Sequence, residues 1–203
     1  EAIVNNRLGK LTLGTIRLRW CRKQKYYDQD DWRGTWKEDG GVLTNQASHH
    51  IDLLQWMMGE VVSVKAYGKT MLADIEAEDT AVAILKFKSG ALGVIEATTA
   101  TRPRDLEGSL SLLGEKGTVE IGGFAVNEMK VWDFEDKLES DNDVLTNYSV
   151  NPPNVYGYGH TLYYQHVIDS LLHNSSRLID GLEARKSLEI VNAIYDSIES
   201  SSP

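Results

Sequence analysis

Asn45, His49 and His50 bring the side-chain types of a proton-transfer site into one short segment, residues 40–59, GGVLTNQASHHIDLLQWMMG. Residues four apart lie on one face of a helix, so a helix here would place Asn45 one turn before His49. His50 would be turned away from them by about 100°. An imidazole, whose ordinary pKa is about 6.5, can take up a proton at neutral pH, and an amide can hydrogen-bond the reacting group.

The rest of the segment bears on whether this histidine is catalytic or structural. Leu53 and Trp56 continue the stripe of Asn45 and His49 inward, which would put His49 at the edge of a core. Asp52 follows His49 by three residues and could orient its ring. The Gly40-Gly41 pair allows close approach of backbone or ligand. On residue types alone, the two roles are evenly balanced.

Other catalytic patterns fit the sequence poorly. A helical zinc pair needs His-Glu-x-x-His, whereas His49 and His50 are adjacent and diverge, so no metal site is predicted. No Gly-x-Ser-x-Gly motif marks a hydrolase. The stretch GYGHTL at 157–162 starts like a dinucleotide turn, but Leu162 replaces the third glycine and no strand precedes it. We interpret it as a helix entry with His160 as a candidate pocket residue.

Three arginines are candidates for holding a carboxylate or phosphate through paired hydrogen bonds. Arg33 follows Trp32 in DWRGTW, and Arg102 and Arg104 lie in TRPRD. Each arginine alone is more often part of a surface ion pair. Residues 23–39, which contain Arg33, form a polar and aromatic loop that is too long for a simple connector, which favours a functional loop.

The elements that must position these residues follow from hydrophobic periodicity. Helical spacing and stop signals predict helices at 42–58, 158–174 and 181–199. Alternation predicts strands at 11–20, 61–72, 79–88, 91–101, 108–114, 117–121 and 129–134, with a bulge near Gly14. Clustered strands indicate an α+β fold: a large open, mostly antiparallel sheet with helices on one face. Apolar residues on both phases of the strands between 81 and 95 predict that a partner covers the other face.

Composition limits the class of protein. The chain has 203 residues, a net charge of -9 and no long apolar run, which argues against nucleic-acid binding and a membrane span. The one cysteine, Cys21, is interpreted as a buried strand thiol, in keeping with a reducing, cytoplasmic setting. The start at Glu1, within EAIVNNRLG, reads as the end of a helix, which indicates a domain of a longer protein.

The spacing of the central segment resembles the Gfo/Idh/MocA oxidoreductase family. The matching positions are Gly40, Gly41, Asn45, His49, Asp52, Leu53, Leu54, Trp56 and Gly59. Three further stretches support the resemblance: DWRGTWKEDGG at 31–41, LLGEKGTVEIGG at 112–123 and IDGLEARKSLEIVNAIYDS at 179–197. It covers nearly the whole chain in the expected order.

The resemblance implies a two-domain enzyme of which residues 1–203 are one domain. Family members have an N-terminal Rossmann domain that binds NAD or NADP and a C-terminal domain that carries the substrate and forms the oligomer interface. The dinucleotide glycines and the Glu-Lys-Pro segment with the catalytic lysine have no counterpart here. The isolated chain is therefore expected to lack activity, with the cofactor bound mainly by the missing domain.

The sequence also resembles one branch of the family. Many members carry Asp four residues before the histidine, where this sequence has Asn45. Together with DWRGTW and TRPRDLEGSL, this departure is similar to the branch that oxidises the 3-hydroxyl of UDP-N-acetylglucosaminuronic acid for bacterial surface polysaccharides. The resemblance implies that His49 is the general base and Asn45 a positioning residue. Arg33, Trp32, Arg102, Arg104 and His160 would contact the nucleotide sugar. The alternatives are another sugar or polyol dehydrogenase of the family, or a non-catalytic binding or assembly domain.

Overall fold

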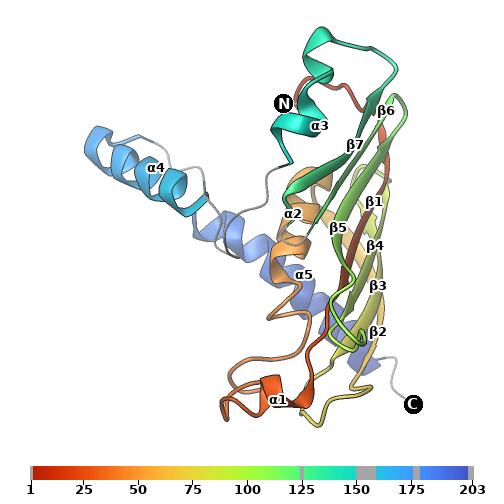
Figure 1. Ribbon diagram of the computed structural model, residues 1–203, viewed down its shortest axis with the longest axis vertical. Helices are drawn as coiled ribbons and strands as arrows, with labels where there is room; N and C mark the ends of the chain where they lie inside the picture. The colour runs from red at the N-terminus through yellow and green to blue at the C-terminus, as the bar shows by residue number, and fades with distance from the viewer. Residues whose placement is uncertain (1, 124–125, 150–158, 176–178, 201–203) are drawn as a thin grey trace.

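One seven-stranded sheet forms the body of the protein (Figure 1). The computed structural model describes residues 2–123, 126–149, 159–175 and 179–200. The strands lie in the order β2-β3-β4-β1-β5-β6-β7. Their bounds are β1 Leu11–Arg19, β2 Val61–Lys69, β3 Thr80–Phe87, β4 Leu92–Thr98, β5 Glu107–Gly114, β6 Gly117–Gly122 and β7 Glu128–Phe134. Every strand predicted from alternation is present, so the α+β prediction is confirmed.

The first strand lies in the middle of the sheet. β1 pairs with β4 in parallel and with β5 antiparallel, and all other pairs are antiparallel. The register of β1 against β5 shifts between Leu11 and Leu13, close to the bulge predicted near Gly14. β3 and β4 form a hairpin whose turn includes Gly90 at φ +90°, a conformation that glycine adopts without strain.

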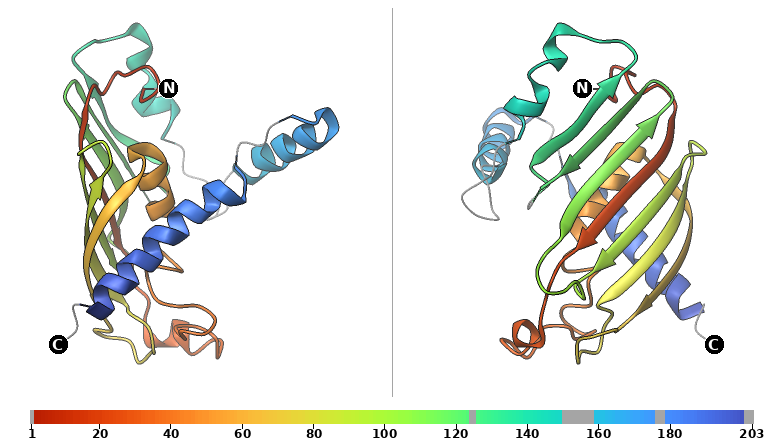
Figure 2. Two further views of the ribbon diagram at one scale, coloured as in Figure 1. Left: turned by 180° about the vertical axis from the view of Figure 1, so that it is seen from behind. Right: turned by 45° about the vertical axis from the view of Figure 1, so that its right-hand side comes forward.

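Helices cover one face of the sheet. Figure 2 shows α2 (Ser48–Met58) and the long α5 (Gly181–Ser200) on the same side of the strands. The other helices are α1 (Gln24–Tyr27), the 3-10 turn η1 (Glu139–Asp141), α3 (Val144–Asn147) and α4 (Gly159–His173). Among the described residues, no helix combines the length and apolarity needed to cross a membrane.

The core lies between the sheet and these two helices. Ile51, Leu54 and Met58 of α2 are buried, as their helical spacing predicts, and they join a single cluster with inward-facing strand residues. Gly14 of β1 lets α2 approach, because a Cβ there would lie 2.8 Å from atoms of Leu54 and Met58. The sheet therefore holds α2 by close packing, and α2 carries the candidate histidines.

Four local predictions are wrong in detail. The helix predicted at 42–58 begins only at Ser48, and 42–47 form a turn. Residues 2–8 are hydrogen-bonded turns rather than a helix end, although Gly9 does take the positive φ expected of a stop. Trp56 does not point inward: it is 69% exposed and lines the pocket between α2 and α5. Cys21 follows β1 and is half-buried rather than a buried strand thiol.

The face of the sheet opposite the helices is open. Its apolar side chains on β2, β3 and β4 are exposed: Val62, Tyr67, Val82, Ile84 and Leu92. Toward the centre of this face, Arg19 on β1 makes paired hydrogen bonds to Glu96 at 2.6 and 2.7 Å. The interruption at Pro152-Pro153 and the residues Gly157 and Tyr158 lie outside the described residues.

Candidate active site

The turn formed by residues 41–47 leads directly into α2. The backbone N–H of Asn45 donates to the carbonyl of Gly41 at 3.1 Å, and that of Ala47 donates to Val42 at 2.8 Å. The N–H of Ile51 then donates to Ala47 at 2.9 Å. This unbroken series of backbone bonds couples the position of the turn to that of the first residues of α2, including His49.

The side chain of Asn45 is held by an acid from the preceding loop. Its Nδ2 donates to Asp39 Oδ1, and Asp39 Oδ2 accepts from the Gly34 N–H at 2.8 Å. The carbonyl of Asp39 also accepts from the hydroxyl of Thr44 at 2.7 Å. Asp39 thus connects the Trp32–Gly40 loop to the turn. Sequence reasoning missed Asp39, and its place one residue before the Gly-Gly pair was the available signal.

His49 is exposed in the first turn of α2 and borders a shallow pocket between α2 and α5. The pocket lining includes two carboxylates besides the imidazole, and it is formed by Ser48, His49, Asp52, Leu53, Gln55, Trp56, Ile179, Glu183, Ala184 and Ser187. No hydrogen bond between Asp52 and His49 is found in the described part of the chain. An exposed imidazole beside a pocket can exchange a proton with a bound molecule.

His50 has the opposite environment. Its side chain is buried, its ring meets Trp20 edge-on at 6.0 Å between centroids, and neither ring nitrogen has a hydrogen-bond partner among the described residues. Burial, and to a smaller extent the nearby His49, lower the pKa of His50 to about 4. His50 is therefore a neutral core residue at neutral pH, and of the two histidines only His49 is accessible.

Aromatic rings hold Arg33 at the far end of the loop. Its guanidinium lies 4.5 Å from the ring centroid of Tyr26 and 4.6 Å from that of Trp32, and its Nε donates to Asp30 at 2.9 Å. Trp32 is partly exposed. Such stacking fixes a planar cation, which suits it for binding a carboxylate or phosphate.

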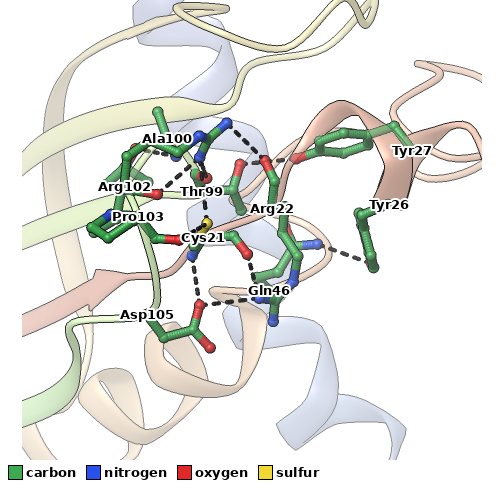
Figure 3. A network of polar contacts seen from close by, with 12 residues as sticks. Cys21, Arg22, Tyr26, Tyr27, Gln46, Thr99, Ala100, Arg102, Pro103 and Asp105 are labelled. Carbon is green, nitrogen blue, oxygen red and sulfur yellow. Dashed lines mark hydrogen bonds and ion pairs between the residues drawn. The ribbon is translucent and has the colours of Figure 1, made fainter.

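Arg102 forms part of a polar network with the end of β1 (Figure 3). Its Nη1 donates to the carbonyls of Thr99 at 3.1 Å and Thr101 at 2.8 Å, and its Nη2 donates to that of Arg22 at 3.1 Å. Asp105 accepts from Arg22 and from the Cys21 N–H in the same network. These bonds occupy much of the Arg102 guanidinium with backbone carbonyls.

Arg104 is exposed and makes no hydrogen bond or ion pair with the described residues, whereas His160 lies in the first turn of α4. The candidate residues are thus spread over separate elements. Asn45 lies in the turn that precedes α2, Arg33 in the stacked loop with Trp32, and Arg102 in the β4–β5 connection.

Two more residues contact the turn from distant parts of the sequence. Glu78 Oε1 accepts from the Leu43 N–H at 3.0 Å and from the hydroxyl of Tyr195 at 3.1 Å. Sequence reasoning singled out neither residue. For Glu78, the only local signal was the acidic pair Glu78-Asp79 next to a predicted strand.

Gly41 is packed so tightly that substitution should destabilise the protein. A Cβ there would lie 2.2 Å from both the carbonyl oxygen and Oε2 of Glu78. We expect Gly41→Ala to lower the free energy of unfolding by about 3 kcal/mol, the cost of an overpacked site. Chemical denaturation of the variant and the wild type measures this loss of unfolding free energy. In the matched control, Gly181→Ala at the start of α5, a Cβ meets nothing within 4 Å, so an equal loss there would contradict the steric explanation.

The chemistry of this site depends on its own side chains and on any group brought by another part of the protein. No group of three or more His, Cys, Asp or Glu side chains is placed to hold a metal ion in the described part of the chain. A nicotinamide cofactor would need a glycine-rich turn between a strand and a helix for its pyrophosphate. The elements described here offer no such turn. His49 lines the pocket between α2 and α5.

Comparisons with known proteins found a matching family and similar solved structures. The sequence model of the Gfo/Idh/MocA oxidoreductase family, C-terminal alpha/beta domain, matches residues 1–203. The WlbA dehydrogenase of Bordetella pertussis, solved with NADH and UDP-GlcNAcA, is 45% identical with a TM-score of 0.92, and covers 99% of this chain and 58% of its own. The WlbA dehydrogenase of Chromobacterium violaceum, also solved with NADH and UDP-GlcNAcA, is 43% identical with a TM-score of 0.89. The match covers 98% of this chain and 55% of that chain.

A more distant similarity involves polyol dehydrogenases. The myo-inositol dehydrogenase Hyg17 of Streptomyces leeuwenhoekii is 32% identical over 96 residues, which are 45% of this chain and 29% of that protein. The chain therefore spans well under two thirds of the length of the relatives it matches, both in the curated proteins and in the solved structures.

Proposed function

Because the chain belongs to the Gfo/Idh/MocA oxidoreductase family through its C-terminal alpha/beta domain, we propose that it is the substrate-binding part of an NAD-dependent nucleotide-sugar dehydrogenase. The reaction would oxidise the 3-hydroxyl of a UDP-N-acetylglucosaminuronic acid for surface polysaccharides in the cytoplasm. The observation that carries this proposal is the exposed His49 beside a pocket, four residues after an asparagine fixed by Asp39. The WlbA relatives, solved with UDP-GlcNAcA, support the choice of substrate class.

In the proposed mechanism, His49 takes the proton of the reacting hydroxyl. A bound nicotinamide, held mainly outside this chain, would supply the hydride acceptor. Asn45 keeps a carbonyl oxygen to offer the substrate while Asp39 holds its amide nitrogen, so it positions the hydroxyl without relaying a proton. On the substrate side, Arg33 on its aromatic rings would hold an anionic group of the nucleotide sugar. Trp32, Arg104, Arg102 and His160 are the other proposed contacts.

The substrate assignment is tested on the full-length enzyme that contains this chain. We expect isothermal titration to detect binding of the UDP-linked uronate and no binding of myo-inositol at equal concentration. NADH should likewise form with the UDP-linked uronate and not with myo-inositol. Binding of myo-inositol in preference to the uronate would contradict the assignment. The isolated chain should give no turnover, and measurable turnover by it would contradict the proposal that half of the site lies elsewhere.

A second candidate within the family is a polyol dehydrogenase. It is favoured by the local identity to myo-inositol dehydrogenases, including 40% over 62 residues to the myo-inositol 2-dehydrogenase of Thermotoga maritima. The whole-chain likeness to the WlbA dehydrogenases at 43–45% identity supports the nucleotide sugar more strongly. The same titration separates the two candidates. A chain that binds sugar but supports no turnover at full length would instead be a binding or assembly domain.

The open face of the sheet is proposed as the contact between copies of the protein. Exposed side chains such as Ile84 at 61% and Leu92 at 57% form an apolar area on neighbouring strands. Close by, the Arg19–Glu96 pair could fix the orientation of a second copy. Sedimentation that finds only monomer at micromolar concentration would contradict this proposal.

A further inference from the structure

Glu78 joins three separate parts of the fold through one residue. Its Oε1 accepts from the Leu43 N–H at 3.0 Å and from the Tyr195 hydroxyl on α5 at 3.1 Å. Its backbone carbonyl accepts from the Val42 N–H at 2.9 Å. Two consecutive N–H groups of the turn therefore donate to one residue just before β3. This is the task that a capping residue performs at a helix start, carried out here from a distant strand.

The close fit of Gly41 shows that this contact determines where the turn lies. With a hypothetical Cβ only 2.2 Å from the Glu78 carboxyl, the backbone of Gly41 rests directly on that group. From Gly41 the backbone bonds continue to Asn45, and from Val42 to Ala47. Any shift of the turn relative to Glu78 is thus passed to the residues that carry the proposed chemistry.

The α5 side of the contact is fixed as well. The Tyr195 ring meets Trp36 edge-on at 5.2 Å between centroids, so α5 also braces the loop that contains Asp39. The Glu78 side chain is 5% exposed, and its Oε2 is buried with no partner among the described residues. Burial raises the pKa of Glu78 to about 6. A buried carboxyl whose second oxygen is unpaired lowers the stability of the folded protein.

We propose that Glu78 is a positioning residue, which acts through the turn to hold Asn45 and His49 in their reactive arrangement. This inference rests on the proposed function. It predicts that removing the acceptor oxygen slows the chemical step more than it weakens substrate binding, because a displacement of about 1 Å at a reacting group can reduce the rate about 10²-fold.

The test compares Glu78→Met with Glu78→Gln in the full-length enzyme. Methionine keeps similar length but removes the acceptor, whereas glutamine keeps Oε1. We expect Glu78→Met to lower kcat by about 10- to 100-fold while KM for the UDP-linked uronate changes less than about threefold. Glu78→Gln should restore kcat to within about threefold of wild type. Hydrogen exchange at the Leu43 amide, which donates to the Glu78 side chain, should rise in the methionine variant only.

A matched control separates positioning from a general loss of stability. Leu85→Ala removes a buried side chain farther along β3, away from the turn, and should lower the melting temperature without lowering kcat of the folded enzyme. Equal kcat losses in Leu85→Ala and Glu78→Met, or in Glu78→Gln and Glu78→Met, would overturn the inference. If Glu78→Met does not fold, Tyr195→Phe decides: a several-fold fall in kcat at unchanged KM supports the inference, and an unchanged kcat overturns it.

Failure of this inference is distinguishable from failure of the proposed function. If His49→Ala abolishes turnover while Glu78→Met keeps kcat within threefold of wild type, the dehydrogenase proposal stands and the positioning role does not. If His49→Ala keeps full turnover, the base assignment fails whatever the Glu78 variants do.

Discussion

His49→Ala in the full-length enzyme should lower kcat by about 10²- to 10⁴-fold, the usual contribution of a general base. The reacting hydroxyl must lose its proton as the adjacent C–H bond gives up hydride, and His49 is the exposed imidazole beside the pocket. Because its side chain lies outside the core, removing it should leave the fold intact. The initial rate of NADH formation at saturating substrate measures the effect.

The controls for this prediction are a second substitution at His49 and the removal of one other histidine. His49→Gln keeps a hydrogen-bonding side chain that cannot act as a base near neutral pH, so it should lose nearly as much activity as alanine. His173→Ala removes another exposed histidine, at the end of α4, and should leave turnover unchanged. If His49→Ala keeps turnover within a few-fold of wild type, His49 is not the base.

The second large effect is a loss of stability in acid caused by His50. Its pKa in the folded protein is lowered from 6.5 to about 4, first by burial and then by His49. A lowered pKa means that the unfolded chain binds the proton more readily, so acid favours unfolding. The stability contribution is fully present above about pH 6.5 and is lost as the pH falls toward 4. The lowered pKa of His50 corresponds to about 3 kcal/mol of unfolding free energy.

Glu78 acts in the opposite direction over part of the same range. Burial raises its pKa from 4.5 to about 6, so the folded protein binds the proton more readily than the unfolded chain. Its contribution is fully present below about pH 4.5 and is lost as the pH rises through 6, with a size of about 2 kcal/mol. Between pH 6 and 4.5 the two residues largely offset one another, and the net acid loss is steepest outside that window.

Comparing wild type with His50→Leu isolates the histidine. Urea denaturation at pH 7 and pH 4 gives the change in unfolding free energy for each protein, and Glu78 and the other carboxylates titrate in both. We expect the acid loss in wild type to exceed that in His50→Leu by about 3 kcal/mol. The same acid loss in both proteins would show that His50 is not protonated on unfolding in this range.

Local patterns predicted the elements of this fold well, because each depends on neighbours in sequence. Alternation located the strand cores of β3 (80–87) and β4 (92–98), and helical spacing located the buried face of α2 through Ile51 and Leu54. The start of α2 was missed, because Glu78 receives the first N–H groups of residues 42–47 and supports a turn in place of a helix. A pattern in one segment contains no information about such a partner.

The sequence predicted the candidate site only in part. Sequence spacing alone associated Asn45 with His49 and left the two histidines evenly balanced between core and chemistry. The tertiary structure buries His50 against Trp20 and leaves His49 exposed, since the packing of α2 on the sheet determines which face of the helix is covered. The tertiary structure also places Asp39 so that it accepts a hydrogen bond from the Asn45 side chain.

The sequence by itself determined where the strands and helices lie, that the sheet is mostly antiparallel, and which segment carries the imidazole. Only the tertiary structure decided that β1 lies beside β4 in parallel, that the turn rests on Glu78 and that Tyr195 reaches it from α5. The physical reason is distance along the chain. Alternation and helical period reflect burial of nearby side chains, whereas these contacts join groups as far as 117 residues apart, and their free energy depends on packing that no short segment specifies.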